Sequence, residues 1–129
     1  MAEVAASYFD VYAERSDFDR FMSFYADDAY LKDVVYGNEV RGKENIRRFF
    51  DWNGGNFKAV GPGPALTIEA QIVSGEIVVT RGVFNRFEYG GKVLGPWEFV
   101  IWQQFNESGE IIRQEDWINY SPKEIHVGE

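Results

Sequence analysis

The chain changes its hydrophobic period about halfway along, and this change is the strongest constraint on its fold. Apolar side chains first recur at helical spacing within residues 4–15, 18–25 and 43–50. From Leu66 onward, apolar and polar side chains alternate, and glycine-containing turns separate strands predicted at 66–72, 77–87, 97–105 and 111–119. Strands joined by short turns form an antiparallel sheet. Helices followed by strands predict an α+β fold, and 129 residues fit a single domain spanning 1–129.

The first half also contains short predicted strands. Ser16 and Asp19 form a capping box that opens the second helix, and residues 26–29 end that helix. A strand is then predicted over Tyr30–Asp33, and Gly37 marks a turn into a second short strand.

Composition excludes several classes of function. Acidic residues outnumber basic ones by 21 to 13 and the net charge is −8, which disfavours nucleic acid and anionic membranes as partners. The chain has no cysteine and His126 is its one histidine, so disulfides, thiolate nucleophiles and histidine-rich metal sites are excluded. We expect neither a metal nor a cofactor. Without a signal-peptide pattern or an apolar run of the ~20 residues that a membrane helix needs, the expected location is the cytoplasm.

Three stretches carry a resemblance to a known family. They are Tyr25–Asp33 (YADDAYLKD), Arg41–Phe50 (RGKENIRRFF) and Ser108–Trp117 (SGEIIRQEDW). In this order, the chain resembles the nuclear transport factor 2-like superfamily, whose enzymes include ketosteroid isomerases, scytalone dehydratases, limonene-type epoxide hydrolases and SnoaL-like polyketide cyclases. The resemblance implies a cone-shaped, curved antiparallel sheet, an α+β half-barrel wrapped around N-terminal helices and enclosing a hydrophobic pocket. It also implies a homodimer through the outer sheet face, where we place Trp102 and Trp117.

Strand alternation sorts the candidate site residues, and the resemblance suggests which set faces the pocket. The suggested inner set contains Asp33, Arg81, Ile101 and Asp116, and the catalytic candidates are Asp33, Arg81 and Asp116. Alternatively, Asp33 caps the turn before Gly37, and Arg81 with Asp116 forms a structural ion pair. The expected ligand-binding residues are apolar: Phe9, Leu31, Phe50, Val83, Trp97, Phe99 and Ile101.

Two enzyme branches match the chain only in part. Asp33 aligns with the base of the ketosteroid isomerases, but Phe9 and Ile101 stand where that family has its oxyanion donors. Tyr8 and Tyr12 are expected to point elsewhere, so steroid isomerisation is not expected.

In the epoxide hydrolase branch, Arg81 and Asp116 match an Asp-Arg-Asp constellation, whereas Val83 replaces its other aspartate. Asp33 falls where that branch has an asparagine, and Leu31 falls where it has a tyrosine.

The sequence therefore predicts a pocket for a small hydrophobic molecule. The first hypothesis is a cofactor-independent lyase, isomerase or cyclase that acts on a hydrophobic carbonyl or hydroxy compound. In it, Arg81 keeps Asp116 ionised as the base, and Asp33 has the higher pKa and donates the proton. The alternatives are an epoxide-hydrolase-like hydrolase and a non-catalytic ligand-binding or dimeric accessory domain.

Overall fold

The computed structural model of the chain describes residues 2–50, 58–60 and 63–120. The helices are α1 (Ala2–Glu14), α2 (Phe18–Ser23) and α3 (Lys43–Phe50). The larger sheet has the order β2-β1-β9-β8-β5-β4. Its strands are β1 (Tyr25–Asp33), β2 (Asn38–Arg41), β4 (Leu66–Ser74), β5 (Ile77–Phe84), β8 (Trp97–Phe105) and β9 (Ile111–Ile118). The smaller sheet has the order β3-β6-β7 and consists of β3 (Lys58–Ala59), β6 (Phe87–Tyr89) and β7 (Lys92–Leu94).

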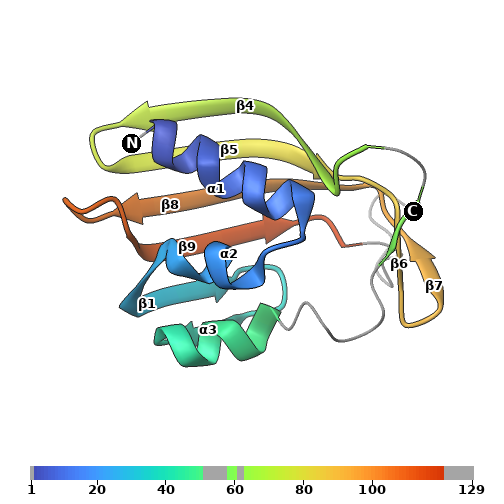
Figure 1. The fold of residues 1–129 in the computed structure, drawn as a ribbon, viewed down its shortest axis with the longest axis horizontal. Coiled ribbons are helices and arrows are strands. Elements are labelled where there is room, and N and C mark those ends of the chain that lie inside the picture. Colours follow the sequence, from blue (N-terminus) through green and yellow to red (C-terminus); the bar gives the residue numbers. More distant parts are fainter. Residues whose placement is uncertain (1, 51–57, 61–62, 121–129) are drawn as a thin grey trace, which may run out of the picture.

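The α+β prediction is confirmed, with the helices lying over one face of a curved sheet (Figure 1). Pairing is antiparallel from β9 through β8 and β5 to β4, as the consecutive turns predict. The sheet is nevertheless mixed, because β1 and β9 pair in parallel. It is also open rather than barrel-like, since β2 and β4 are its two outer strands. The half-barrel implied by the resemblance is thus an open, curved sheet, with one parallel pair in place of the purely antiparallel order.

The second helix ends earlier than its apolar spacing predicts. Asp17, rather than Ser16, caps α2 by accepting from the Arg20 amide at 3.0 Å. Tyr25 is already the first residue of β1. It pairs with Ile111 of β9, and both side chains are buried. Tertiary pairing of Tyr25 with β9 thus overrides the last turn of the predicted helix.

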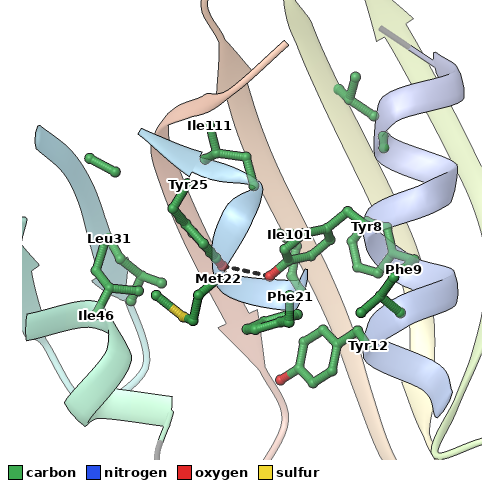
Figure 2. Close-up of a cluster of buried hydrophobic side chains, with 14 of the residues drawn as sticks. Tyr8, Phe9, Tyr12, Phe21, Met22, Tyr25, Leu31, Ile46, Ile101 and Ile111 are labelled. Atoms are coloured by element: carbon green, nitrogen blue, oxygen red, sulfur yellow. Dashed lines mark hydrogen bonds between the residues drawn. The ribbon is translucent and has the colours of Figure 1, made fainter. Parts of the chain in front are cut away.

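Aromatic side chains fill the space between α1, α2 and the sheet (Figure 2). Tyr8 makes edge-to-face contacts with Phe9 and Tyr25, at ring-centre distances of 5.0 and 5.8 Å. Phe99 lies over Gly82, where a Cβ atom would come within 2.8 Å of the Phe99 ring and 2.4 Å of the Thr67 carbonyl oxygen. A residue without a side chain is therefore required at this point of β5.

Candidate functional site

A cavity of about 240 Å³ opens at the end of the inner face where β6 and β7 adjoin the larger sheet. Its wall is mainly aromatic and carries one carboxylate, that of Asp116. The described lining residues are Tyr12, Arg15, Phe49, Phe50, Ala65, Phe84, Phe87, Tyr89, Leu94, Trp97, Asp116, Ile118 and Tyr120. Such a wall suits a compact, largely apolar molecule with a polar group facing Asp116.

Strand register brings Asp116 and Asp33 together. Asp116 of β9 pairs with Asp33 of β1 on one side and with Ile101 of β8 on the other. Both carboxyl groups lie on the inner face, and each residue is 3% exposed. The two predicted catalytic aspartates thus lie side by side, although of the two only Asp116 is among the described lining residues of the cavity.

Asp116 is a buried ionisable group whose carboxylate accepts a hydrogen bond from a neutral amide, that of Gln114. Burial raises the pKa of Asp116 to about 7, a hydrogen bond from Gln114 lowers it, and the charge of Asp33 raises it. A carboxyl group with such a pKa can take up and release a proton near neutral pH.

Asp33 is held on one side only. Its Oδ2 accepts from Asn38 Nδ2 at 3.5 Å, while its buried Oδ1 has no hydrogen-bond partner within residues 2–50, 58–60 and 63–120. Burial raises the pKa of Asp33, whereas hydrogen bonds from Asn38, Tyr120 and the backbone of the following turn lower it. The turn-capping alternative is thus part of its role, since the same carboxyl group interacts with the turn and faces Asp116.

The expected inward position of Arg81 is wrong. Thr80 pairs with Ile101 on the inner face, so the next residue, Arg81, lies on the outer face opposite Val100. Its side chain is 66% exposed and pairs with Glu69 at 3.7 Å between Nε and Oε1. Val83 shares the parity of Arg81, so its expected place in the pocket is wrong for the same reason.

Because Arg81 lies on the outer face, the expected order of the Asp116 and Asp33 pKa values changes as well. The nearest partner of the Asp116 carboxylate is the neutral amide of Gln114, at 2.9 Å from Nε2 to Oδ1. Arg81 therefore does not keep Asp116 ionised, and burial gives Asp116 its large upward pKa shift. The prediction that Asp33 has the higher pKa is therefore not supported.

The remaining expected pocket residues divide into wall and core. Phe50 and Trp97 line the cavity, and the Trp97 ring contacts Tyr120 edge-to-face at 5.0 Å. The other four are packed in the core cluster, outside the described wall: Phe9, Leu31, Phe99 and Ile101.

A buried polar cluster escaped the sequence interpretation. Its members are Tyr8, Tyr25, Gln103 and Gln114, all 0% exposed and linked by hydrogen bonds. The expectation that Tyr8 and Tyr12 point away is wrong, because Tyr8 joins this cluster and Tyr12 lines the cavity. The available signal was strand parity, which puts both glutamines on the face of Asp116.

Two other kinds of feature, a metal-binding cluster and a membrane-spanning helix, are absent from the described residues. No group of three or more histidine, cysteine, aspartate and glutamate side chains there is placed to hold a metal ion. None of the described helices has the length and apolar character needed to cross a membrane.

Solved structures with the same fold come from several bacteria. A Shewanella putrefaciens CN-32 protein assigned as a SnoaL-like polyketide cyclase is 18% identical, with a TM-score of 0.74 over 92% of this chain and 88% of that one. An M. tuberculosis LEH-like epoxide hydrolase is 16% identical, with a TM-score of 0.70 over 90% and 80%. An NTF-2 like protein of unknown function from Burkholderia xenovorans LB400 is 18% identical, with a TM-score of 0.68 over 98% and 87%.

At these identities the likeness concerns the fold, and the named activities belong to those proteins. No curated protein sequence matches the chain. The sequence itself matches the SnoaL-like domain over residues 5–114. With most of its length matched and the expected open, curved sheet in place, the chain belongs to the SnoaL-like domain family.

Proposed function

We propose that this protein is a cofactor-independent lyase, isomerase or cyclase that moves a proton on a small, largely apolar carbonyl or hydroxy compound. One observation carries the proposal: a buried carboxyl group, Asp116, stands on the wall of an aromatic cavity with a pKa raised to about 7 by burial. General acid–base catalysis is most effective when the pKa of the catalytic group lies near the working pH.

The cavity supplies the other requirements of such chemistry. Its aromatic wall favours an apolar ligand by burying ligand surface and excluding water. Tyr12 also lines it, and burial raises the pKa of its phenol, so this hydroxyl stays protonated and can donate to a ligand oxygen. Tyr120 lines the cavity too, but its single hydroxyl proton goes to Asp33. In this proposal, Asp116 exchanges the proton and a tyrosine hydroxyl polarises the carbonyl group.

Asp33 supports the proton transfer from the neighbouring strand. Its negative charge raises the pKa of Asp116, which makes Asp116 a stronger base once ionised. We propose that Asp116 is the acid–base catalyst and that Asp33, bound by Asn38 and Tyr120, supplies the neighbouring charge.

Hydrolysis of an epoxide is the second candidate. The solved M. tuberculosis enzyme with this fold favours it, and Asp116 faces the cavity as a water-activating carboxylate would. The outward position of Arg81 weighs against it, because the predicted Asp-Arg-Asp constellation is not assembled on the inner face.

The experiment compares the unmodified protein with Asp116→Asn on a panel of small ketones, enones and hydroxy ketones in D₂O. Proton NMR measures hydrogen exchange and product formation. We expect Asp116→Asn to reduce turnover by a factor on the order of 100 or more, since general acid–base groups contribute that much. Asp28→Asn, which alters an exposed carboxylate of β1, is the matched control and should leave turnover unchanged.

Two results would change the proposal. Transfer of ¹⁸O from labelled water into the diol formed from an epoxide panel would favour the hydrolase. Ligands that bind without any turnover, or full activity in Asp116→Asn, would contradict acid–base catalysis by this residue.

A further inference from the structure

Gln114 shares the inner face of β9 with Asp116, and every hydrogen-bonding group of its amide has a partner. Its Oε1 accepts from the Tyr25 hydroxyl at 3.1 Å and from Gln103 Nε2 at 2.8 Å. Its Nε2 donates to Asp116 Oδ1 at 2.9 Å and to the Tyr8 hydroxyl at 3.4 Å. A side-chain amide has two donor hydrogens and two acceptor lone pairs, so this set of partners is complete.

Three of these side chains form a closed ring of hydrogen bonds. The single proton of the Tyr25 hydroxyl goes to Gln114, so Tyr8 is the donor in the 2.6 Å bond between the two tyrosine hydroxyls (Figure 2). Gln114 Nε2 then donates back to Tyr8. Bonds that run in one direction around a ring strengthen one another. The ring uses one N–H of Gln114 and leaves the other for Asp116.

The opposite orientation of the Gln114 amide would create mismatches on two sides. It would turn Nε2 toward Gln103 Nε2, where two donors would meet unless the Gln103 amide, whose buried Oε1 has no partner among the described residues, turned with it. It would also turn Oε1 toward Asp116 Oδ1, where two acceptors would meet. Gln103 and Gln114 are both 0% exposed, so no solvent relieves such a mismatch.

We infer that Gln114 is a positioning residue for Asp116, and that Tyr8, Tyr25 and Gln103 keep its N–H group aimed at the Asp116 carboxylate. The cluster thereby acts on the cavity although it lies outside the described wall. The catalytic consequence rests on the proposed function, whereas the positioning itself concerns the Asp116 carboxylate alone.

The charge state of Asp116 reports this positioning. Burial raises the pKa of Asp116 and the Gln114 donor lowers it, because an N–H group favours the ionised carboxylate. The other titratable groups that act on Asp116 are Asp33 of β1, the phenols of Tyr8 and Tyr12 from α1, Tyr25 from β1, and Tyr120. The Arg15 guanidinium, just after α1, lines the same cavity. The phenols stay neutral over the range in which Asp116 titrates, so Asp33 is the neighbour whose charge must be followed in parallel.

The test is an NMR titration of the full chain that follows the carboxyl carbons of Asp116 and Asp33 and the side-chain amide of Gln114. In the unmodified protein, the Gln114 amide signals should shift with the ionisation of Asp116, with a midpoint near pH 7. Tyr25→Phe and Gln103→Met each remove one donor to Gln114 Oε1 without touching Asp116. Each should lower the ionisation constant of Asp116, on the order of threefold, because the amide can then turn away.

Tyr30→Phe is the matched control, since it removes a hydroxyl that binds Glu39 at the opposite face of β1. It should leave the Asp116 midpoint unchanged. The inference is overturned if the Gln114 amide does not respond to Asp116 in the unmodified protein, a result that needs no variant to fold. It is equally overturned if both variants keep the original midpoint.

These outcomes are separable from those of the proposed function, because the titration needs no substrate. If the Gln114 amide titrates together with Asp116 but the protein shows no turnover, the positioning role stands and the catalytic role is rejected. Turnover lost in Asp116→Asn, with midpoints unmoved in Tyr25→Phe and Gln103→Met, would retain the catalysis and reject the positioning.

Discussion

The two faces of the central strands hold polar side chains of similar kinds under opposite conditions. On the outer face, charged groups meet opposite charges in solvent, as in the 3.7 Å pair of Arg81 with Glu69 and the 3.1 Å pair of Arg113 with Glu115. On the inner face, Asp116 meets neutral donors, a second carboxylate and aromatic rings.

This difference shows that oppositely charged side chains pair on the solvent-exposed outer face, where an ion pair contributes least to stability. Solvent-exposed ion pairs contribute only about 0–1 kcal/mol. A buried carboxylate without a cation costs far more, unless it binds a proton. The inner face therefore keeps an acid–base group at the expense of stability, and the outer face keeps an ordinary solvated surface.

The largest expected effect is a gain in stability on removing the inner charge. Burial raises the pKa of Asp116 from its ordinary value of 3.8 to about 7 in the folded chain. A group whose folded pKa is raised stabilises the fold below its unfolded pKa and loses this contribution as pH rises through its folded pKa. The unmodified protein should therefore lose stability between about pH 4 and pH 7, by up to about 4 kcal/mol from this group.

Asp116→Asn keeps an acceptor for Gln114 and has no charge to bury, so it should remove most of that loss. Urea unfolding at pH 5 and pH 8 measures the effect, with Asp28→Asn as the control for a carboxylate in solvent. A variant more stable than the unmodified protein at pH 8, yet inactive, would sharpen the contrast between the faces. If the free energy of unfolding changes with pH in the same way in both proteins, the idea that Asp116 buries a charge at high pH is refuted.

The second prediction contrasts neighbouring residues of β5 that face opposite ways. Gly82→Ala should lower the free energy of unfolding by about 2 to 3 kcal/mol, because its methyl group would collide with the Thr67 carbonyl oxygen and the Phe99 ring. Arg81→Ala should change it by less than about 0.5 kcal/mol, since the side chain is 66% exposed and its ion pair is solvated. Equal effects from the two substitutions, measured by urea unfolding, would contradict the assigned faces.

Much of the fold was predictable because periodicity reports burial directly. The alternation within Trp97–Phe105 gave that strand its bounds, and the alternating burial of β8 confirms it. The inner position of Asp116 followed from strand parity together with the family resemblance. The parallel pairing of β1 with β9 was not predictable, because it joins residues more than eighty positions apart through no turn.

The site was harder to predict because parity within one strand does not say which parity faces inward. The family alignment put Arg81 on the inner face of β5. The next residue, Gly82, in fact lies on that face, where its missing side chain lets the Phe99 ring approach. The polar cluster was missed because glutamine and tyrosine are common on exposed surfaces too. Only the packing of α1 and β1 against β8 and β9 shows that these groups hydrogen-bond to one another.

The last prediction concerns the outer face, where the homodimer expected from the sequence stays a prediction. Across β5, β8 and β9, register aligns Arg81, Val100 and Trp117 in one row. Val100 is 37% exposed and Trp117 is 41% exposed, whereas Trp102 is half-buried beside Glu115. Because exposed apolar groups that adjoin on a sheet favour association, we expect two copies to meet at this row.

Trp117→Lys should convert a dimer into a monomer in sedimentation velocity at micromolar concentration, because it adds a like charge to each copy at the twofold contact. We expect the monomer's own free energy of unfolding to change by less than about 0.5 kcal/mol, since the indole lies on the solvent side of the sheet. Val93→Lys, at an exposed position of β7 in the smaller sheet, should leave the dimer intact. If the unmodified chain sediments as a monomer, or if Trp117→Lys stays dimeric, the outer face is a solvated surface like any other.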